Sequence, residues 1–110
     1  MNQRELVLLP FPFSDLSGRK VRPALVVSND NFNKNSEDVI VCAVTSNITR
    51  SNYSVLIIQK NLEEGKLFVK SIIKIENILK IKKSLVLKKI GRINKSTFSK
   101  VKEKINEIIK

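Results

Sequence analysis

Short apolar runs separated by polar breaks dominate the chain, and this pattern predicts a sheet of short strands. The run at 38–45 is apolar at nearly every position, so we expect that strand to lie in the middle of the sheet. Glu76 and Asn77 interrupt a later apolar run, where we expect a break. The Asn-rich stretch 30–37 predicts a loop. The expected strands are 5–9, 23–29, 38–45 and 52–58. After a turn or a single helical turn at 60–66, closed by Gly65, we expect two strands within 70–81, separated by that break, and a last strand at 84–93.

The hydrophobic period changes after Asn94. The apolar residues beyond it fall at spacings of three and four, which predicts one buried face of a helix: Phe98, Val101, Ile105, Ile108 and Ile109. Asn94 is a suitable N-cap, because its side-chain oxygen can accept a hydrogen bond from a backbone N–H of the first turn. The expected fold is mostly β (α+β), an SH3-like small barrel with a C-terminal helix packed on it, in one domain of residues 1–110.

The connection between the first two expected strands is long, whereas hairpin loops usually have about 2–5 residues. Its residues combine turn-forming and basic character: Asp15, Ser17, Gly18, Arg19, Lys20 and Arg22. A long basic loop beside a sheet face can close over single-stranded nucleic acid. The alternative is a surface loop without a binding role.

The positive charge is unevenly distributed along the chain. Residues 1–65 hold seven Lys/Arg and seven Asp/Glu, whereas residues 66–110 hold fourteen Lys/Arg and three Glu, so the second segment carries the whole net charge of +11. Such a field attracts polyanions and speeds encounter with them. A solvated basic surface produced by a biased composition is the competing interpretation.

Several classes of site are not expected. The chain has no histidine and one cysteine, Cys42, so it offers neither an internal disulfide nor a cysteine-based zinc site. Its acidic residues show no tight metal-binding spacing, so we expect no metal and no cofactor. Cys42 lies in an apolar strand and is expected to be a buried, inert thiol. The apolar runs are too short to span a membrane and no signal-peptide pattern is present, so we expect a cytoplasmic protein.

Four segments together resemble the MazF/PemK family of toxin endoribonucleases: "LVLLPFPFSDLSGRKVRPALVVSND", "VIVCAVTSNI", "GKLFVKSIIKIENILKI" and "IGRINKSTFSKVKEKINEII". They cover nearly the whole chain in order, and the "PFPFSDLSGRKVRPALVVS" portion is the most specific. The resemblance implies an SH3-like homodimer that cuts single-stranded mRNA at short sequences without a metal, through attack of a 2′-hydroxyl on the neighbouring phosphate. It also implies a cognate acidic antitoxin that blocks the RNA groove.

The resemblance places the catalytic arginine of the family at Arg22 and its catalytic threonine at Thr45. A guanidinium is permanently charged and can bind phosphate oxygens through two hydrogen bonds, and a hydroxyl can hold a phosphate oxygen or pass a proton. Further residues are predicted to contact RNA: Phe13, Asp15, Ser17, Arg19, Lys20, Ser46, Asn47 and Asn77.

Two positions depart from the family pattern. Some members carry a glutamate where this chain has Ser17, and many carry a glutamine where it has Asn77. The group that removes the 2′-proton is therefore left open. Two other functions stay open as well: a non-catalytic nucleic-acid-binding barrel, and a protein-directed toxin similar to the gyrase inhibitors that share this general fold.

Overall fold

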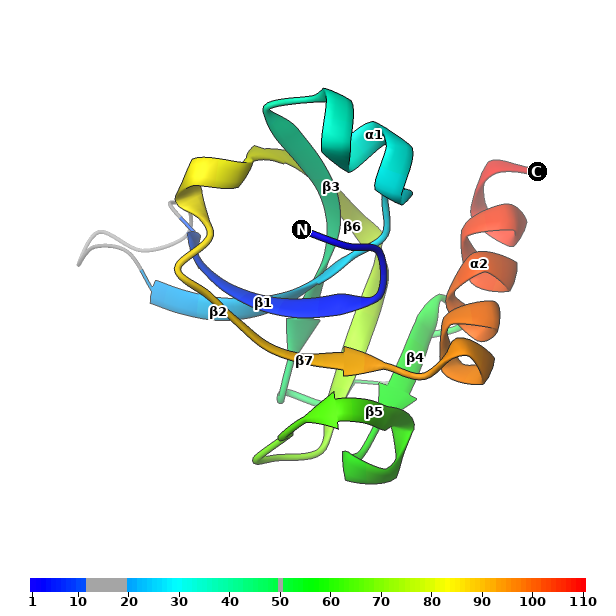
Figure 1. The fold of residues 1–110 in the computed structure, drawn as a ribbon. Helices are drawn as coiled ribbons and strands as arrows, with labels where there is room; N and C mark the ends of the chain where they lie inside the picture. The colour runs from blue at the N-terminus through cyan, green and yellow to red at the C-terminus, as the bar shows by residue number, and fades with distance from the viewer. Residues whose placement is uncertain (12–19, 50) are drawn as a thin grey trace.

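A single antiparallel sheet organises the residues that the computed structural model describes, which are 1–11, 20–49 and 51–110. Its seven strands follow the order β4-β6-β3-β2-β1-β7-β5 and curl into a half-barrel, with α2 standing beside β4 and β6 (Figure 1). The strands are β1 (Glu5–Phe11), β2 (Lys20–Val26), β3 (Asp38–Thr45), β4 (Ser54–Ile57), β5 (Leu62–Gly65), β6 (Ser71–Lys82) and β7 (Lys88–Ile93). The helices are α1 (Asp30–Asn35) and α2 (Lys95–Ile109), and 3-10 turns span Gln59–Asn61 and Lys83–Leu85.

The expected class, a mostly β barrel with a C-terminal helix, is confirmed. β3 matches the predicted 38–45, whereas β2 begins at Lys20 because it pairs with β1 from Phe11 onward. The predictions for two connecting segments were wrong. The expected loop at 30–37 contains α1, whose N-cap Asn29 accepts a hydrogen bond of 2.8 Å from the Phe32 N–H. The expected turn at 60–66 contains β5, which pairs with β7.

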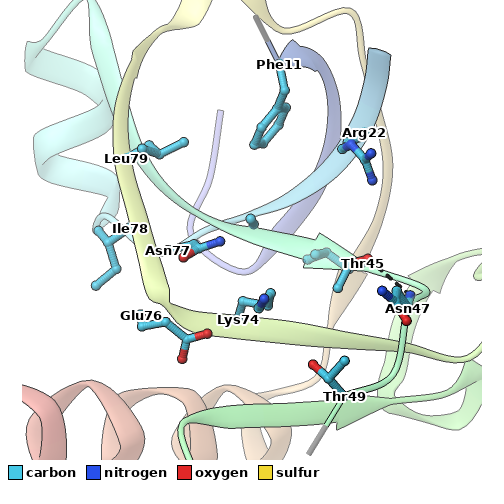
Figure 2. Close-up of a pocket in the computed structure, with 12 residues that line it drawn as sticks. Phe11, Arg22, Thr45, Asn47, Thr49, Lys74, Glu76, Asn77, Ile78 and Leu79 are labelled. Carbon is cyan, nitrogen blue, oxygen red and sulfur yellow. Dashed lines mark hydrogen bonds between the residues drawn. The ribbon is translucent and has the colours of Figure 1, made fainter. Parts of the chain in front are cut away.

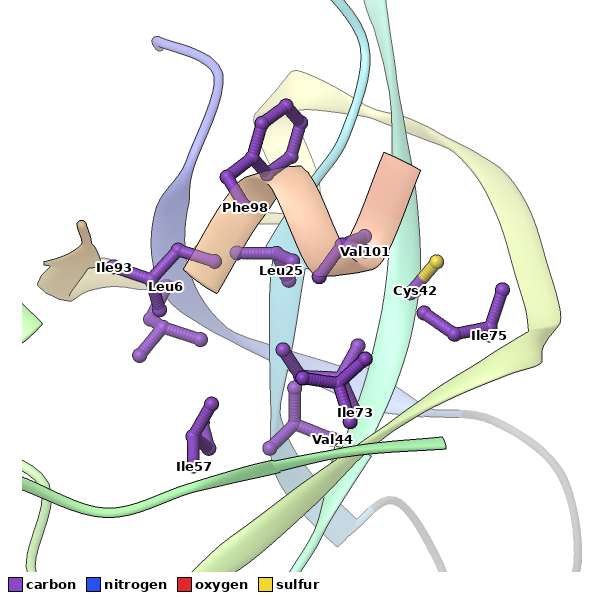
Figure 3. Close-up of a cluster of buried hydrophobic side chains, with 11 residues drawn as sticks. Leu6, Leu25, Cys42, Val44, Ile57, Ile73, Ile75, Ile93, Phe98 and Val101 are labelled. Carbon is purple, nitrogen blue, oxygen red and sulfur yellow. The ribbon is translucent and has the colours of Figure 1, made fainter. Parts of the chain in front are cut away.

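The two faces of the sheet support two separate apolar clusters, because successive residues of a strand point to opposite sides. Leu25 and Cys42 are paired across β2 and β3 and belong to the cluster beneath α2 (Figure 3). Ala24 and Val41 point the other way, into a second cluster that the curl of the sheet encloses. The Cys42 side chain is buried, as predicted.

α2 begins where the sequence predicts. Asn94 accepts hydrogen bonds from the Thr97 N–H at 2.8 Å and from the Ser96 hydroxyl at 3.1 Å. Phe98 and Val101 are buried. Toward the end of the helix the apolar face is exposed to solvent at Ile108 and Ile109. The predicted face therefore packs against the first apolar cluster as far as Ile105, which is partly buried.

β6 runs without a break, but its pairing with β3 shifts within it. Cys42 pairs with Ile78 and the next residue, Ala43, pairs with Lys74, so residues 75–77 have no partner in β3. The Ile75 N–H instead donates to the Tyr53 carbonyl at 3.0 Å. The interruption expected near Glu76–Asn77 is therefore a bulge within a continuous strand. Bulges redirect side chains and often border functional sites.

Candidate active site

A cleft of about 500 Å³ opens where the second apolar cluster ends, between the start of β2, the end of β3 and the bulge of β6. Figure 2 shows the side chains around it. The lining residues are Phe11, Arg22, Ala43, Val44, Thr45, Asn47, Thr49, Lys74, Glu76, Asn77, Ile78 and Leu79. The apolar wall is thus the rim of the second cluster, and the polar groups come from strand ends and from the bulge.

Arg22 and Thr45 both line the cleft, and the register between β2 and β3 explains why. The two strands pair from Val26↔Val41 to Ala24↔Ala43. Continuing that register by two residues places Arg22 opposite Thr45, with both side chains on the face of the second cluster. Pro23 has no N–H to donate, and the recorded pairing starts only after it. The two strand ends therefore lie beside each other at the cleft.

The orientation of the Thr45 hydroxyl is set by the turn that follows β3. Its Oγ1 accepts a hydrogen bond of 3.1 Å from the Asn47 backbone N–H (Figure 2). A hydroxyl that accepts one bond still has its own proton to donate. Thr45 can therefore donate to an oxygen of a ligand that enters the cleft.

Three charged side chains line the cleft: Arg22 on β2, with Lys74 and Glu76 on β6. In the part of the chain that the structure describes, the ion pairs involve none of the three. The lining thus carries one excess positive charge, which suits an anionic ligand.

Burial, and secondarily the charge of Glu76, raises the pKa of the Cys42 thiol to about 12, so this thiol stays protonated at neutral pH.

The structure brings together some predicted site residues and leaves others apart. Four of them line the cleft: Arg22, Thr45, Asn47 and Asn77. Lys20 and Ser46 are exposed and lie outside the lining. The predicted loop residues Phe13, Asp15, Ser17 and Arg19 lie outside the described residues.

Lys74 and Glu76 also line the cleft, although they were not among the site residues predicted from the sequence. The only signal for them was the pair of polar positions within the apolar stretch "SIIKIENI". Their position depends on the β3–β6 register, and a single sequence does not show that register.

Groups of three or more His, Cys, Asp or Glu side chains that could hold a metal ion do not occur among residues 1–11, 20–49 and 51–110. Over the same ranges, the helices lack the combined length and apolar character of a membrane span.

Comparisons with known proteins find solved structures that share this fold and a protein family whose sequence model matches this chain. Solved structures similar to this one include the MazE–MazF complex from Deinococcus radiodurans, with TM-score 0.80 and 19% identity over 99% of this chain and 95% of that chain. MazF from the same organism has TM-score 0.79 and 20% identity over 99% and 96%. An endoribonuclease from Mycobacterial species has TM-score 0.79 and 16% identity over 99% and 90%. Identities this low show a shared fold and no more.

A search of curated protein sequences finds no significant match. Residues 2–109 match the sequence model of a family described as PemK-like, MazF-like toxin of type II toxin–antitoxin system. Because the match spans nearly the whole sequence, this chain belongs to the PemK-like, MazF-like toxins of type II toxin–antitoxin systems.

Proposed function

We propose that this toxin is a sequence-specific endoribonuclease that cuts single-stranded mRNA without a metal or another cofactor. The observation that carries the proposal is that Arg22 and Thr45, on neighbouring strands, line the same cleft. Membership of the family and the shared fold with a protein named as an endoribonuclease support it.

The cleft can supply the main requirements of phosphodiester cleavage. The ribose 2′-oxygen attacks the neighbouring phosphorus while the bond to the 5′-oxygen breaks, leaving a 2′,3′-cyclic phosphate and a free 5′-hydroxyl. Negative charge grows on the non-bridging oxygens, where the Arg22 guanidinium and the Thr45 hydroxyl can stabilise it. The 2′-proton must pass to a base and the leaving oxygen must gain a proton. Glu76 is the carboxylate that the described part of the lining offers for the first transfer.

The proposed partners follow from the family. Solved relatives include an endoribonuclease in complex with its cognate antitoxin and a MazE–MazF complex. We expect this chain to bind an acidic antitoxin, to act as a homodimer and to work in the cytoplasm. Binding of an acidic segment over the cleft would compete with RNA for the charge of Arg22 and Lys74.

The test is incubation of purified protein with a mixed RNA pool in EDTA, followed by sequencing of the fragment 5′ ends. We expect cleavage at a short recurring sequence. Arg22→Ala should lower the cleavage rate about 10²–10³-fold, as expected for loss of a main transition-state donor. Arg22→Lys keeps the charge but loses the two-point hydrogen bonding, so it should recover only part of the rate.

Lys82→Ala provides a matched control, because it removes a positive charge from an exposed position of β6 outside the cleft. It should cut RNA at the wild-type rate. Salt-sensitive RNA binding without cleavage, unaffected by Arg22→Ala, would instead support the non-catalytic nucleic-acid-binding barrel. Indifference to RNA would favour a protein-directed toxin.

A further inference from the structure

Lys74 occupies the point on β6 where regular pairing with β3 stops. It pairs with Ala43 of β3 on one side and with Ser54 of β4 on the other. Ala43 and Thr45 are two residues apart on one strand, so Lys74 lies on the same face of the sheet as Thr45. β6 and β2 flank β3, so Lys74 and Arg22 reach the cleft from the two strands on either side of Thr45 (Figure 2).

The neighbours of Lys74 leave space above β3 for a ligand. Ala43 of β3 pairs with Lys74 and lines the cleft beside it, and its side chain is only a methyl group. A larger side chain at position 43 would fill the space between Arg22 and Lys74. The small side chain of Ala43 therefore leaves the cleft open between the strand that carries Arg22 and the strand that carries Lys74.

The charge of Lys74 has no partner in the described part of the protein. Its side chain is half-buried, and no carboxylate of the described residues, Glu76 included, lies within ion-pair distance of it. Opposite charges attract more strongly where water is partly excluded. An anion that enters the cleft would therefore gain from a contact with this unpaired charge.

We propose that Lys74 binds a backbone phosphate of the RNA next to the scissile phosphate held by Arg22 and Thr45. This assignment rests on the proposed function and extends it, because it makes the cleft a site for two successive phosphates. Lys74 is then a positioning residue: it fixes the register of the strand without touching the reacting atoms.

The binding test uses mixed-sequence single-stranded RNA with 2′-O-methyl riboses, which lacks the attacking hydroxyl. Affinity is measured at several salt concentrations. Each phosphate contact contributes about 0.7 to the slope of log K against log salt for single strands. Lys74→Met should therefore lower the slope by about 0.7 and weaken binding by about tenfold, as expected for one charged hydrogen bond. Lys74→Arg should keep the wild-type slope, and Lys82→Met should keep both slope and affinity.

The kinetic test uses an RNA that the wild type cuts. Lys74→Met should raise KM by about tenfold and change kcat by less than about threefold, whereas Arg22→Ala should lower kcat.

In the binding test, a wild-type salt slope in Lys74→Met overturns the assignment of Lys74 even if the wild type cuts RNA. An unchanged slope with weaker binding of a synthetic poly-glutamate peptide overturns it in favour of a protein contact. If the wild type binds the methylated RNA but cuts no RNA, the proposed function fails, and the slope still decides the role of Lys74. If the wild type neither binds the methylated RNA nor cuts RNA, both the proposed function and the assignment of Lys74 fail.

Discussion

At the scale of single residues, the hydroxyl of Thr45 carries the sharpest prediction. Valine has the same shape but cannot donate to a phosphate oxygen, so Thr45→Val should lower the single-turnover cleavage rate by about 10²-fold. The Asn47 N–H that loses its acceptor is exposed, so the free energy of unfolding should fall by less than about 1 kcal/mol. Urea unfolding checks the second expectation. Thr45→Ser keeps the hydroxyl and should stay active, and a valine variant of near wild-type rate would remove Thr45 from the chemistry.

The residues of the site differ in how far they could be predicted. Arg22 and Thr45 belong to local motifs, so their positions could be proposed before any fold was known. Lys74 and Glu76 enter the cleft only because the β3–β6 register shifts at the bulge. Such pairing depends on residues more than thirty positions apart, and hydrophobic periodicity does not encode it.

Among the elements, those with a strong apolar pattern were predicted well and the weakly patterned ones were not. β3 is apolar at every position between Asp38 and Thr45, and α2 combines a cap with a regular period, so both begin where expected. α1 was missed because asparagine favours loops, yet here Asn29 caps the helix and Asn33 is buried against Ser28. β5 was missed because "LEEG" has little apolar character. The segment forms a strand through its antiparallel pairing with β7.

β5 also offers a prediction at the scale of elements. Gly65 has φ of +85°, and a Cβ placed there would lie 2.2 Å from the Ile90 carbonyl oxygen. Gly65→Ala should therefore lower the free energy of unfolding by at least about 2 kcal/mol, since left-handed backbone strain and a backbone clash add together. Urea denaturation measures the loss.

The neighbouring exposed position provides the control for that variant. Lys66→Ala should change stability by no more than about 0.5 kcal/mol. β5 is the edge strand farthest from β6 in the sheet, so Gly65→Ala should leave kcat of the folded fraction unchanged. A fully stable Gly65→Ala variant would mean that the β5–β7 pairing differs from the one described here.

At the scale of the whole molecule, the sheet separates the cleft from the lysines of α2. α2 covers the face of the first apolar cluster, whereas Arg22, Thr45 and Lys74 point to the opposite face. Lysines on α2 therefore lie on the far side of the sheet from the reacting groups. Charge at such a distance acts on the approach of RNA through the long-range field, and it does not act on the bond that breaks.

This separation predicts a purely kinetic effect of the α2 charge. Lys95 and Lys100 are exposed, and the double variant Lys95→Gln/Lys100→Gln lowers the net charge from +11 to +9. We expect kcat/KM for RNA cleavage to fall about two- to threefold at low ionic strength, because steering weakens, while kcat is unchanged. The difference should disappear near 1 M salt, where the screening length is about 3 Å. The Lys95→Arg/Lys100→Arg variant keeps the charge and should behave as wild type at every salt concentration. A fall in kcat, or a difference that persists at high salt, would show that α2 touches the RNA directly and that the cleft is only part of the binding surface.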